Sequence, residues 1–151
     1  MLRISIAVAM LAGLALPVRA ETEFEGSLCI SATNTACQAA GWNAGYCLGV
    51  RYAPRNVGTN GADTQLSLFG QNFAVGFALA SGNPVSSAFL NVTAAKVAGG
   101  GYTYPLKFRL TSHSPAAPAT TTPNIVFNGV FANWDEIPGC NVTFRAATTR
   151  R

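Results

Sequence analysis

The sequence predicts an all-β protein, a small antiparallel β-sandwich of seven or eight short strands stabilised by disulfides. Apolar residues recur with a period of two along most of the chain after about residue 48, which is typical of strands. Fifteen glycines and eight prolines supply tight turns, and four cysteines can link the strands. A chain of 151 residues has room for one domain.

The first twenty residues predict a secretory signal peptide. A positive N-terminus with Arg3 precedes the uncharged, apolar residues 4–16, a stretch long enough for a secretory leader and too short for a transmembrane helix. Pro17 ends this stretch, and Val18 and Ala20 place small residues at the third-last and last positions before the cut, so we predict cleavage before Glu21. The mature domain is then residues 21–151, without a transmembrane span, in the periplasm or outside the cell.

Cleavage leaves eight Lys/Arg (ten less the two within residues 1–20) and six Asp/Glu, a net charge of +2. This charge is too small to indicate a nucleic-acid partner. Acidic residues gather at the new N-terminus and basic residues near the C-terminus, so the two ends can pair if they meet, although exposed pairs contribute little. The residues concerned are Glu21, Glu23, Glu25, Arg145, Arg150 and Arg151.

The four cysteines predict two disulfides, because export places Cys29, Cys37, Cys47 and Cys140 in an oxidising compartment. Three pairings are open. We favour Cys29 with Cys37 as a local loop and Cys47 with Cys140 as a long-range link. The chain has one histidine and no CxxC spacing, so neither a metal nor another cofactor is expected.

Eight runs of residues are expected to form strands. In residues 73–80 bulky and small side chains alternate, which predicts a strand buried on both faces, whereas residues 106–111 and 142–145 alternate apolar with polar side chains. The other runs are 24–30, 47–52, 65–69, 89–97 and 124–131.

Three further segments have distinct patterns. Residues 35–40 are expected to form one or two helical turns, and Asn128-Gly129 predicts either a two-residue hairpin or a bulge within a longer strand. Residues 112–123 contain three prolines and no periodicity, which predicts a long surface loop. Such a loop is a common place for binding, and a solvated connector is the simpler interpretation.

A small membrane barrel is the alternative architecture. Three features count against it. The strands are shorter than the roughly nine residues a membrane requires, the chain ends in Thr149-Arg150-Arg151 rather than in an apolar strand, and the cysteines are spread through the sequence.

The sequence contains no clear catalytic constellation. Its one histidine, His113, lies in the proline-rich segment with no glycine-framed serine nearby. Asp63, Asp135 and Glu136 are the acids outside the N-terminus, and a pair of carboxylates can hydrolyse a glycosidic bond. Asp135 and Glu136 are neighbours, however, and residues 134–139 predict a turn in which Asp135 bonds its own backbone. We therefore do not expect an enzyme.

Aromatic and neutral polar residues provide the candidate binding site. Sugars stack an apolar face on an aromatic ring while amides and carboxylates satisfy their hydroxyl groups. The competing interpretation is that Trp42 and Trp134 fill the ends of the core. The candidate ligand-binding residues are Asn133, Trp134, Asp135, Glu136, Trp42, Tyr102 and Tyr104.

These observations predict an exported, non-enzymatic binding or structural module for a glycan, an envelope component or a protein partner. Strand addition into a surface assembly falls within this prediction. One alternative is an exported glycan hydrolase that uses Asp63 with Asp135 or Glu136. Another is a secreted hydrolase inhibitor that inserts residues 112–123. The oligomeric state is not indicated.

Overall fold

The computed structural model describes residues 21–58, 60, 64–70, 73–79, 89–91, 93–96 and 106–151. The predicted leader, Asp63, Tyr102 and Tyr104 lie outside these residues. Within the described ranges, no helix has the length and apolar character needed to cross a membrane.

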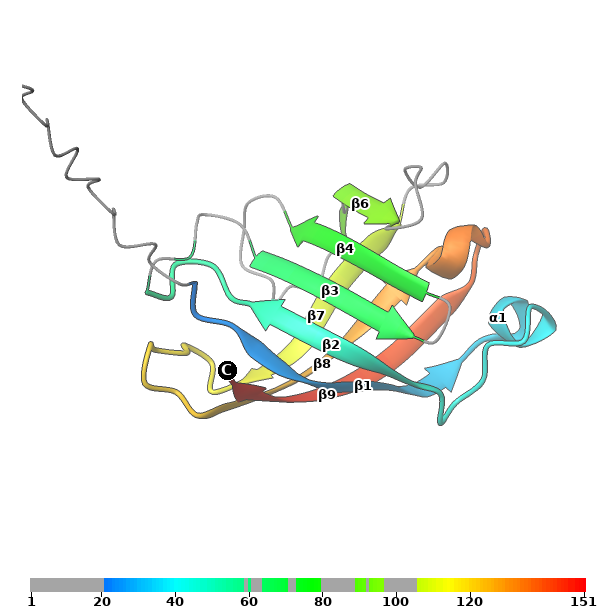
Figure 1. The fold of residues 1–151 in the computed structure, drawn as a ribbon. Helices are drawn as coiled ribbons and strands as arrows, with labels where there is room; N and C mark the ends of the chain where they lie inside the picture. The colour runs from blue at the N-terminus through cyan, green and yellow to red at the C-terminus, as the bar shows by residue number, and fades with distance from the viewer. Residues whose placement is uncertain are drawn as a thin grey trace, which may run out of the picture.

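The described strands form one antiparallel sheet with a single short helix beside it (Figure 1). Each of the eight expected runs overlaps an observed strand, and the run at residues 89–97 carries two. The elements are β1 (Phe24–Thr33), α1 (Thr35–Ala39), β2 (Cys47–Ala53), β3 (Thr64–Gly70), β4 (Phe73–Leu79), β5 (Leu90–Asn91), β6 (Thr93–Lys96), β7 (Lys107–Ser114), β8 (Asn124–Ala132) and β9 (Asn141–Arg150), with a 3-10 turn at Trp134–Glu136.

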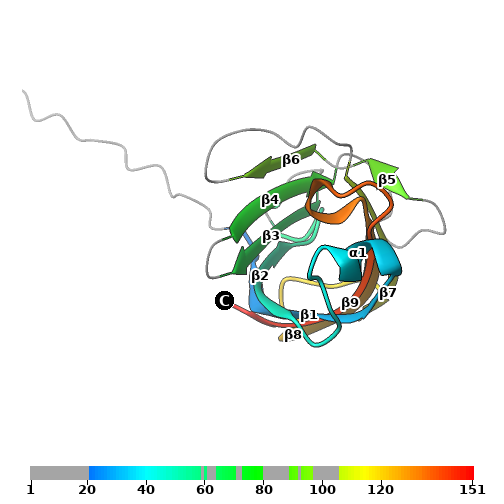
Figure 2. The same cartoon turned by 90° about the vertical axis from the view of Figure 1, so that its right-hand side faces the viewer.

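The sheet curls as a half-barrel, which Figure 2 shows from one end. Its strand order is β5-β7-β8-β9-β1-β2-β3-β4-β6. The first and last strands, β1 and β9, pair at the centre of this order. The two edge strands, β5 and β6, are separated by a single residue along the chain. The sheet has to curl because one short stretch of chain supplies both of its edges.

The expected sandwich of two facing sheets is not what the described strands form. All nine belong to one sheet, and its curled inner face takes the place of the second sheet. Alternation along a strand indicates that one face is buried but not which surface covers it. A sandwich and a curled sheet therefore have the same sequence pattern.

The core fills the inside of the curl. In β1 the buried residues Phe24, Leu28 and Ile30 come from one face, and β8 alternates strictly between buried and less buried positions. An aromatic cluster lies at the centre, with ring centroids 4.9–6.2 Å apart. Its members are Phe108, Phe127, Phe131 and Phe144.

Asn128 and Gly129 lie within the single strand β8, not in a hairpin. The irregularity lies on the opposite strand, where the pairing of β7 shifts between Leu110 and Ser112. A Cβ atom at Gly129 would lie 2.5 Å from Cζ of Phe144. Glycine is therefore needed here for close packing rather than for a turn.

The proline-rich loop is shorter than expected, because β7 continues to Ser114. Ser112 and His113 pair with Asn128 and Phe127 of β8, and Asn128 Nδ2 donates a hydrogen bond of 2.7 Å to Ser112 Oγ. The prolines begin only at residue 115. The first three residues of the segment are therefore free to take part in the sheet.

The two disulfides are present, but the pairing we favoured is wrong. Cys29 is bonded to Cys47, and Cys37 to Cys140. Cys29 and Cys47 lie directly opposite each other on β1 and β2, with Cα atoms 4.0 Å apart. Strand β1 continues to Thr33 before α1 begins. This extended stretch carries Cys37 away from Cys29, so the short sequence spacing between them is misleading.

The start of β1 and the end of β9 meet because these two strands pair in antiparallel register. Arg151 Nη1 lies 3.0 Å from Glu25 Oε1 and 3.9 Å from Glu23 Oε2. The expected pairing of the termini is confirmed for these residues. The side chains are partly exposed, so the pairs contribute little to stability.

Candidate functional site

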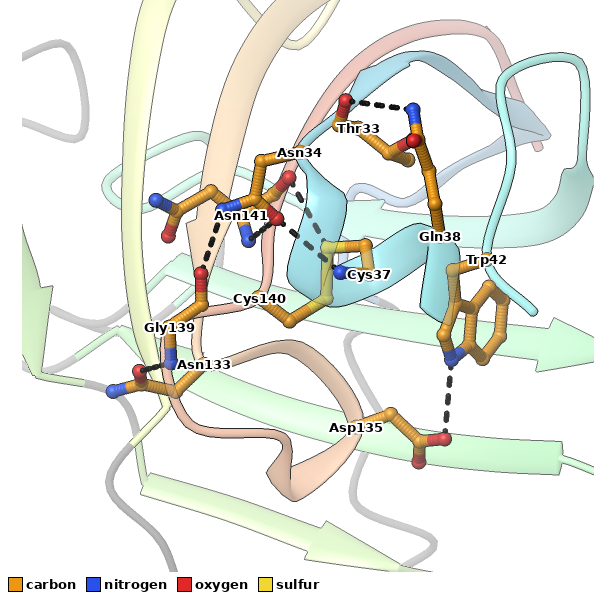
Figure 3. Close-up of a disulfide and its surroundings, with 10 residues drawn as sticks. All are labelled: Thr33, Asn34, Cys37, Gln38, Trp42, Asn133, Asp135, Gly139, Cys140 and Asn141. Atoms are coloured by element: carbon orange, nitrogen blue, oxygen red, sulfur yellow. Dashed lines mark hydrogen bonds between the residues drawn. A yellow bond between two sulfur atoms is a disulfide. The ribbon is translucent and has the colours of Figure 1, made fainter. Parts of the chain in front are cut away.

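At one end of the curled sheet, α1, the loop that leads to β2 and the turn between β8 and β9 lie together (Figures 2 and 3). This region brings together two tryptophans, a tyrosine and an aspartate from distant parts of the sequence. We call it the aromatic cap and define it by Trp42, Tyr46, Trp134 and Asp135.

The side chain of Asn34 joins α1 to the turn before β9. Its Oδ1 accepts hydrogen bonds from the backbone N–H of Cys37 at 3.3 Å and of Asn141 at 3.1 Å, and its Nδ2 donates to the Gly139 carbonyl at 2.8 Å (Figure 3). Asn34 is thus the N-cap of α1 and a link across the cap. The buried Cys37–Cys140 disulfide lies beside it and fixes the same two segments covalently.

The turn between β8 and β9 has an unusual backbone. Asn133, Asp135 and Glu136 have φ values of 61°, 51° and 62°, a region that costs about 1–3 kcal/mol for each residue other than glycine. Asn133 Oδ1 accepts a 3.0 Å hydrogen bond from the Gly139 N–H, which helps to hold this conformation. The predicted turn at residues 134–139 is confirmed.

The rings of the cap differ in exposure. Trp134 is only 1% exposed and packs on Phe131 at a centroid distance of 5.0 Å, so it belongs to the core. Trp42 is partly buried and meets Trp134 edge to face at 5.4 Å. It contacts Tyr46 at 5.1 Å, and Tyr46 is 47% exposed. Trp42 and Tyr46 therefore form the accessible part of the cap.

A carboxylate lies beside these rings. The indole Nε1–H of Trp42 donates to Oδ2 of Asp135 at 3.3 Å (Figure 3). We expected Asp135 to bond its own backbone. Its observed partner, Trp42, is 93 residues away in the sequence, and no sequence pattern indicates this pairing. The hydrogen bond fixes the orientation of the Trp42 ring and places an acceptor at its edge.

The structure brings Trp42, Trp134 and Asp135 of the predicted set into contact. Asn133 and Glu136 lie in the same turn, with the Asn133 amide directed to the Gly139 N–H. Tyr102 and Tyr104 fall outside the described residues. Tyr46 was not among the candidate ligand-binding residues, although the sequence shows it as an aromatic residue immediately before a cysteine.

A second polar arrangement lies near the opposite end of β1, where Phe24 pairs with Tyr52. The Tyr52 hydroxyl lies 3.0 Å from His113 Nε2, and His113 Nδ1 lies 2.6 Å from the Pro115 carbonyl. A carbonyl only accepts, so Nδ1–H donates to it and Nε2 accepts from Tyr52. Burial lowers the pKa of His113 and raises the pKa of Tyr52. Both shifts favour the neutral form of the side chain, which suits a packed polar pair.

No group of three or more His, Cys, Asp or Glu side chains able to hold a metal ion occurs among the described residues. Comparison of the chain with protein-family models, with curated proteins and with solved structures found no significant match.

Proposed function

We propose that the protein is an exported, non-enzymatic module that recognises a glycan at the aromatic cap. The observation that carries the proposal is the hydrogen bond between Trp42 Nε1 and Asp135 Oδ2, beside the exposed ring of Tyr46. It places a carboxylate acceptor at the edge of accessible aromatic rings, which is the combination that sugar recognition uses.

The rigidity of the cap supports this proposal. The loop that carries Trp42 and Tyr46 is flanked by Cys37 and Cys47, and each of these cysteines is in a disulfide. A site whose rings are already fixed loses little conformational entropy when it binds, which favours affinity. The left-handed backbone at Asn133, Asp135 and Glu136 is the kind of local strain that concentrates at functional sites.

Export to the periplasm or beyond is part of the proposal. It is supported by the signal-peptide pattern of residues 1–20 and by two disulfides, which persist in oxidising compartments. Mass spectrometry of the exported protein should find Glu21 as the first residue. Exported protein that begins at Met1 would contradict this part of the proposal.

The test of recognition is a calorimetric screen of the purified protein against a panel of polysaccharides and their oligosaccharides. For a glycan that binds, Trp42→Ala should weaken binding at least tenfold, since it removes both a ring and the partner of Asp135. Trp42→Phe keeps a ring but removes the N–H donor, so it should have a smaller effect. Thr143→Ala, on β9 outside the cap, is the control.

Trp134→Ala does not serve as a binding test, because it removes a core ring. Unaltered affinity in Trp42→Ala, or the absence of binding to every member of the panel, would overturn recognition at the cap. Turnover of a glycan that is abolished by Asp135→Asn without a change in melting temperature would instead indicate a hydrolase.

A further inference from the structure

A shallow trough crosses the outer face of β1, β2 and β3, away from the aromatic cap residues. It has a volume of about 310 Å³, and its lining residues are Glu25, Gly26, Gly49, Val50, Arg51 and Phe69. The trough exists because Gly49 carries no side chain. On this face Gly49 lies between Ser27 of β1 and Phe69 of β3. The row that these three residues form across the strands therefore has no side chain at its centre.

One wall of the trough is aromatic. Phe69 is 42% exposed, so its ring is accessible to a ligand. The guanidinium carbon of Arg51 lies 5.9 Å from the centroid of the Phe69 ring. The trough thus combines an exposed ring, a bare backbone surface at Gly49 and an arginine at its end.

Arg51 and Glu25 line the trough opposite Phe69, and with Glu23 and Arg151 beside it they form a balanced group of charges. Arg51 Nη2 donates to Glu25 Oε1 at 2.8 Å, and Arg51 Nε lies 3.6 Å from Glu23 Oε2. Arg151 contacts the same two carboxylates. Two cations and two anions leave no net charge, so the trough favours a neutral ligand. The side chains of Arg51 and Glu25 are 39% and 43% exposed and remain accessible to one.

We propose that this trough is a second sugar site, which binds the ring of a neutral monosaccharide unit. The apolar face of the sugar lies on Phe69 above Gly49, Arg51 donates to a hydroxyl group and the Glu25 carboxylate accepts from one. Its volume is at the lower end of the range for small-molecule sites, about 300 Å³. The inference deepens the proposed function, on which it rests for the class of ligand.

The test fills the trough by replacing Gly49→Leu. The backbone at Gly49 is not left-handed, and a Cβ there would lie 3.6 Å from the nearest atoms of Phe69, an ordinary contact. The variant should therefore fold. Thr143→Leu adds the same side chain to the outer region of β9 and is the matched control. The ligands are neutral mono- and disaccharides, titrated into labelled protein and followed by two-dimensional NMR.

The two sites give separate signals in this experiment. The inference predicts saturable shifts of the Gly49 amide and of Arg51 Nε–H, at least a tenfold weaker response in Gly49→Leu, and no change in Thr143→Leu. Saturable shifts of the Trp42 indole signal without a shift at Gly49 would refute the trough as a sugar site. Recognition at the aromatic cap would then stand. Shifts at Gly49 with none at the Trp42 indole would support the trough and show that the cap does not bind these sugars. If no sugar shifted the Gly49 amide signal, the trough would also be refuted as a sugar site.

Discussion

Removal of the Cys37–Cys140 disulfide should destabilise the protein more than removal of the Cys29–Cys47 disulfide. The first bond links residues 103 apart in the sequence, and the second links residues 18 apart. A crosslink stabilises mainly by restricting the unfolded chain, and the restriction grows with the length of the closed loop. The long link should therefore contribute the larger free energy of unfolding.

The loop lengths set the magnitude. The chain-entropy relation gives about 5 kcal/mol for the long loop and about 3 kcal/mol for the short one at 25 °C. Burial increases the difference, because Cys37 and Cys140 lie in the core and their truncation leaves a space there. Domains typically have unfolding free energies of about 5–15 kcal/mol, so loss of the long link should remove much of the total.

Urea denaturation of two double variants measures this difference. Cys37→Ala with Cys140→Ala removes the long link, and Cys29→Ala with Cys47→Ala removes the short one. We expect the first variant to unfold at the lower urea concentration, or to be unfolded without urea. Equal midpoints, or a lower midpoint for the second variant, would refute the reasoning from loop length and burial.

Two further predictions concern a titrating side chain and two glycines. Because burial lowers the pKa of His113 from 6.5, the unfolded chain takes up the proton first as the pH falls. The free energy of unfolding should therefore decline as the pH falls from about 6.5 to the folded-state pKa of His113. Urea midpoints at pH 7.5 and 5.5 measure this decline, and the difference between them should be smaller in His113→Gln. If His113→Gln and the unaltered protein had the same pH dependence, this role of His113 would be refuted. A Cβ at Gly26 would lie 2.0 Å from the Ala147 carbonyl oxygen, whereas at Gly49 the nearest atoms are 3.6 Å away. Gly26→Ala should lower the free energy of unfolding by about 1–3 kcal/mol, and Gly49→Ala should lower it by about 0.5 kcal/mol or less. Similar melting temperatures for the two variants would contradict this difference.

The strands could be predicted from the sequence because each has a local signal. Alternation of apolar and polar residues places β7 and β9, and the short helical run TACQAA places α1. The curl of the sheet has no such signal, since it depends on which strands lie side by side. The chain reaches it through the pairing of β1 with β9 and through the single stretch that holds β5 and β6.

The residue types of the candidate site could be predicted from the sequence, but their arrangement in space could not. Trp42 and the Asn-Trp-Asp-Glu run of residues 133–136 lie in two separate segments of the sequence. Their contact depends on the Cys37–Cys140 link and on Asn34, which join residues more than 100 positions apart. The partial burial of Trp42 and the full burial of Trp134 follow from that packing. Two tryptophans that the sequence does not distinguish therefore differ in burial.

The most direct test of recognition at the aromatic cap is the NMR signal of the indole N–H groups during titration with the glycan that binds. The protein has two tryptophans, and Trp42→Phe assigns their signals. We predict that the Trp42 signal shifts with the same saturation curve as calorimetric binding, while the signal of the buried Trp134 moves little. Saturation of binding with the Trp42 signal unmoved would contradict glycan recognition at the cap.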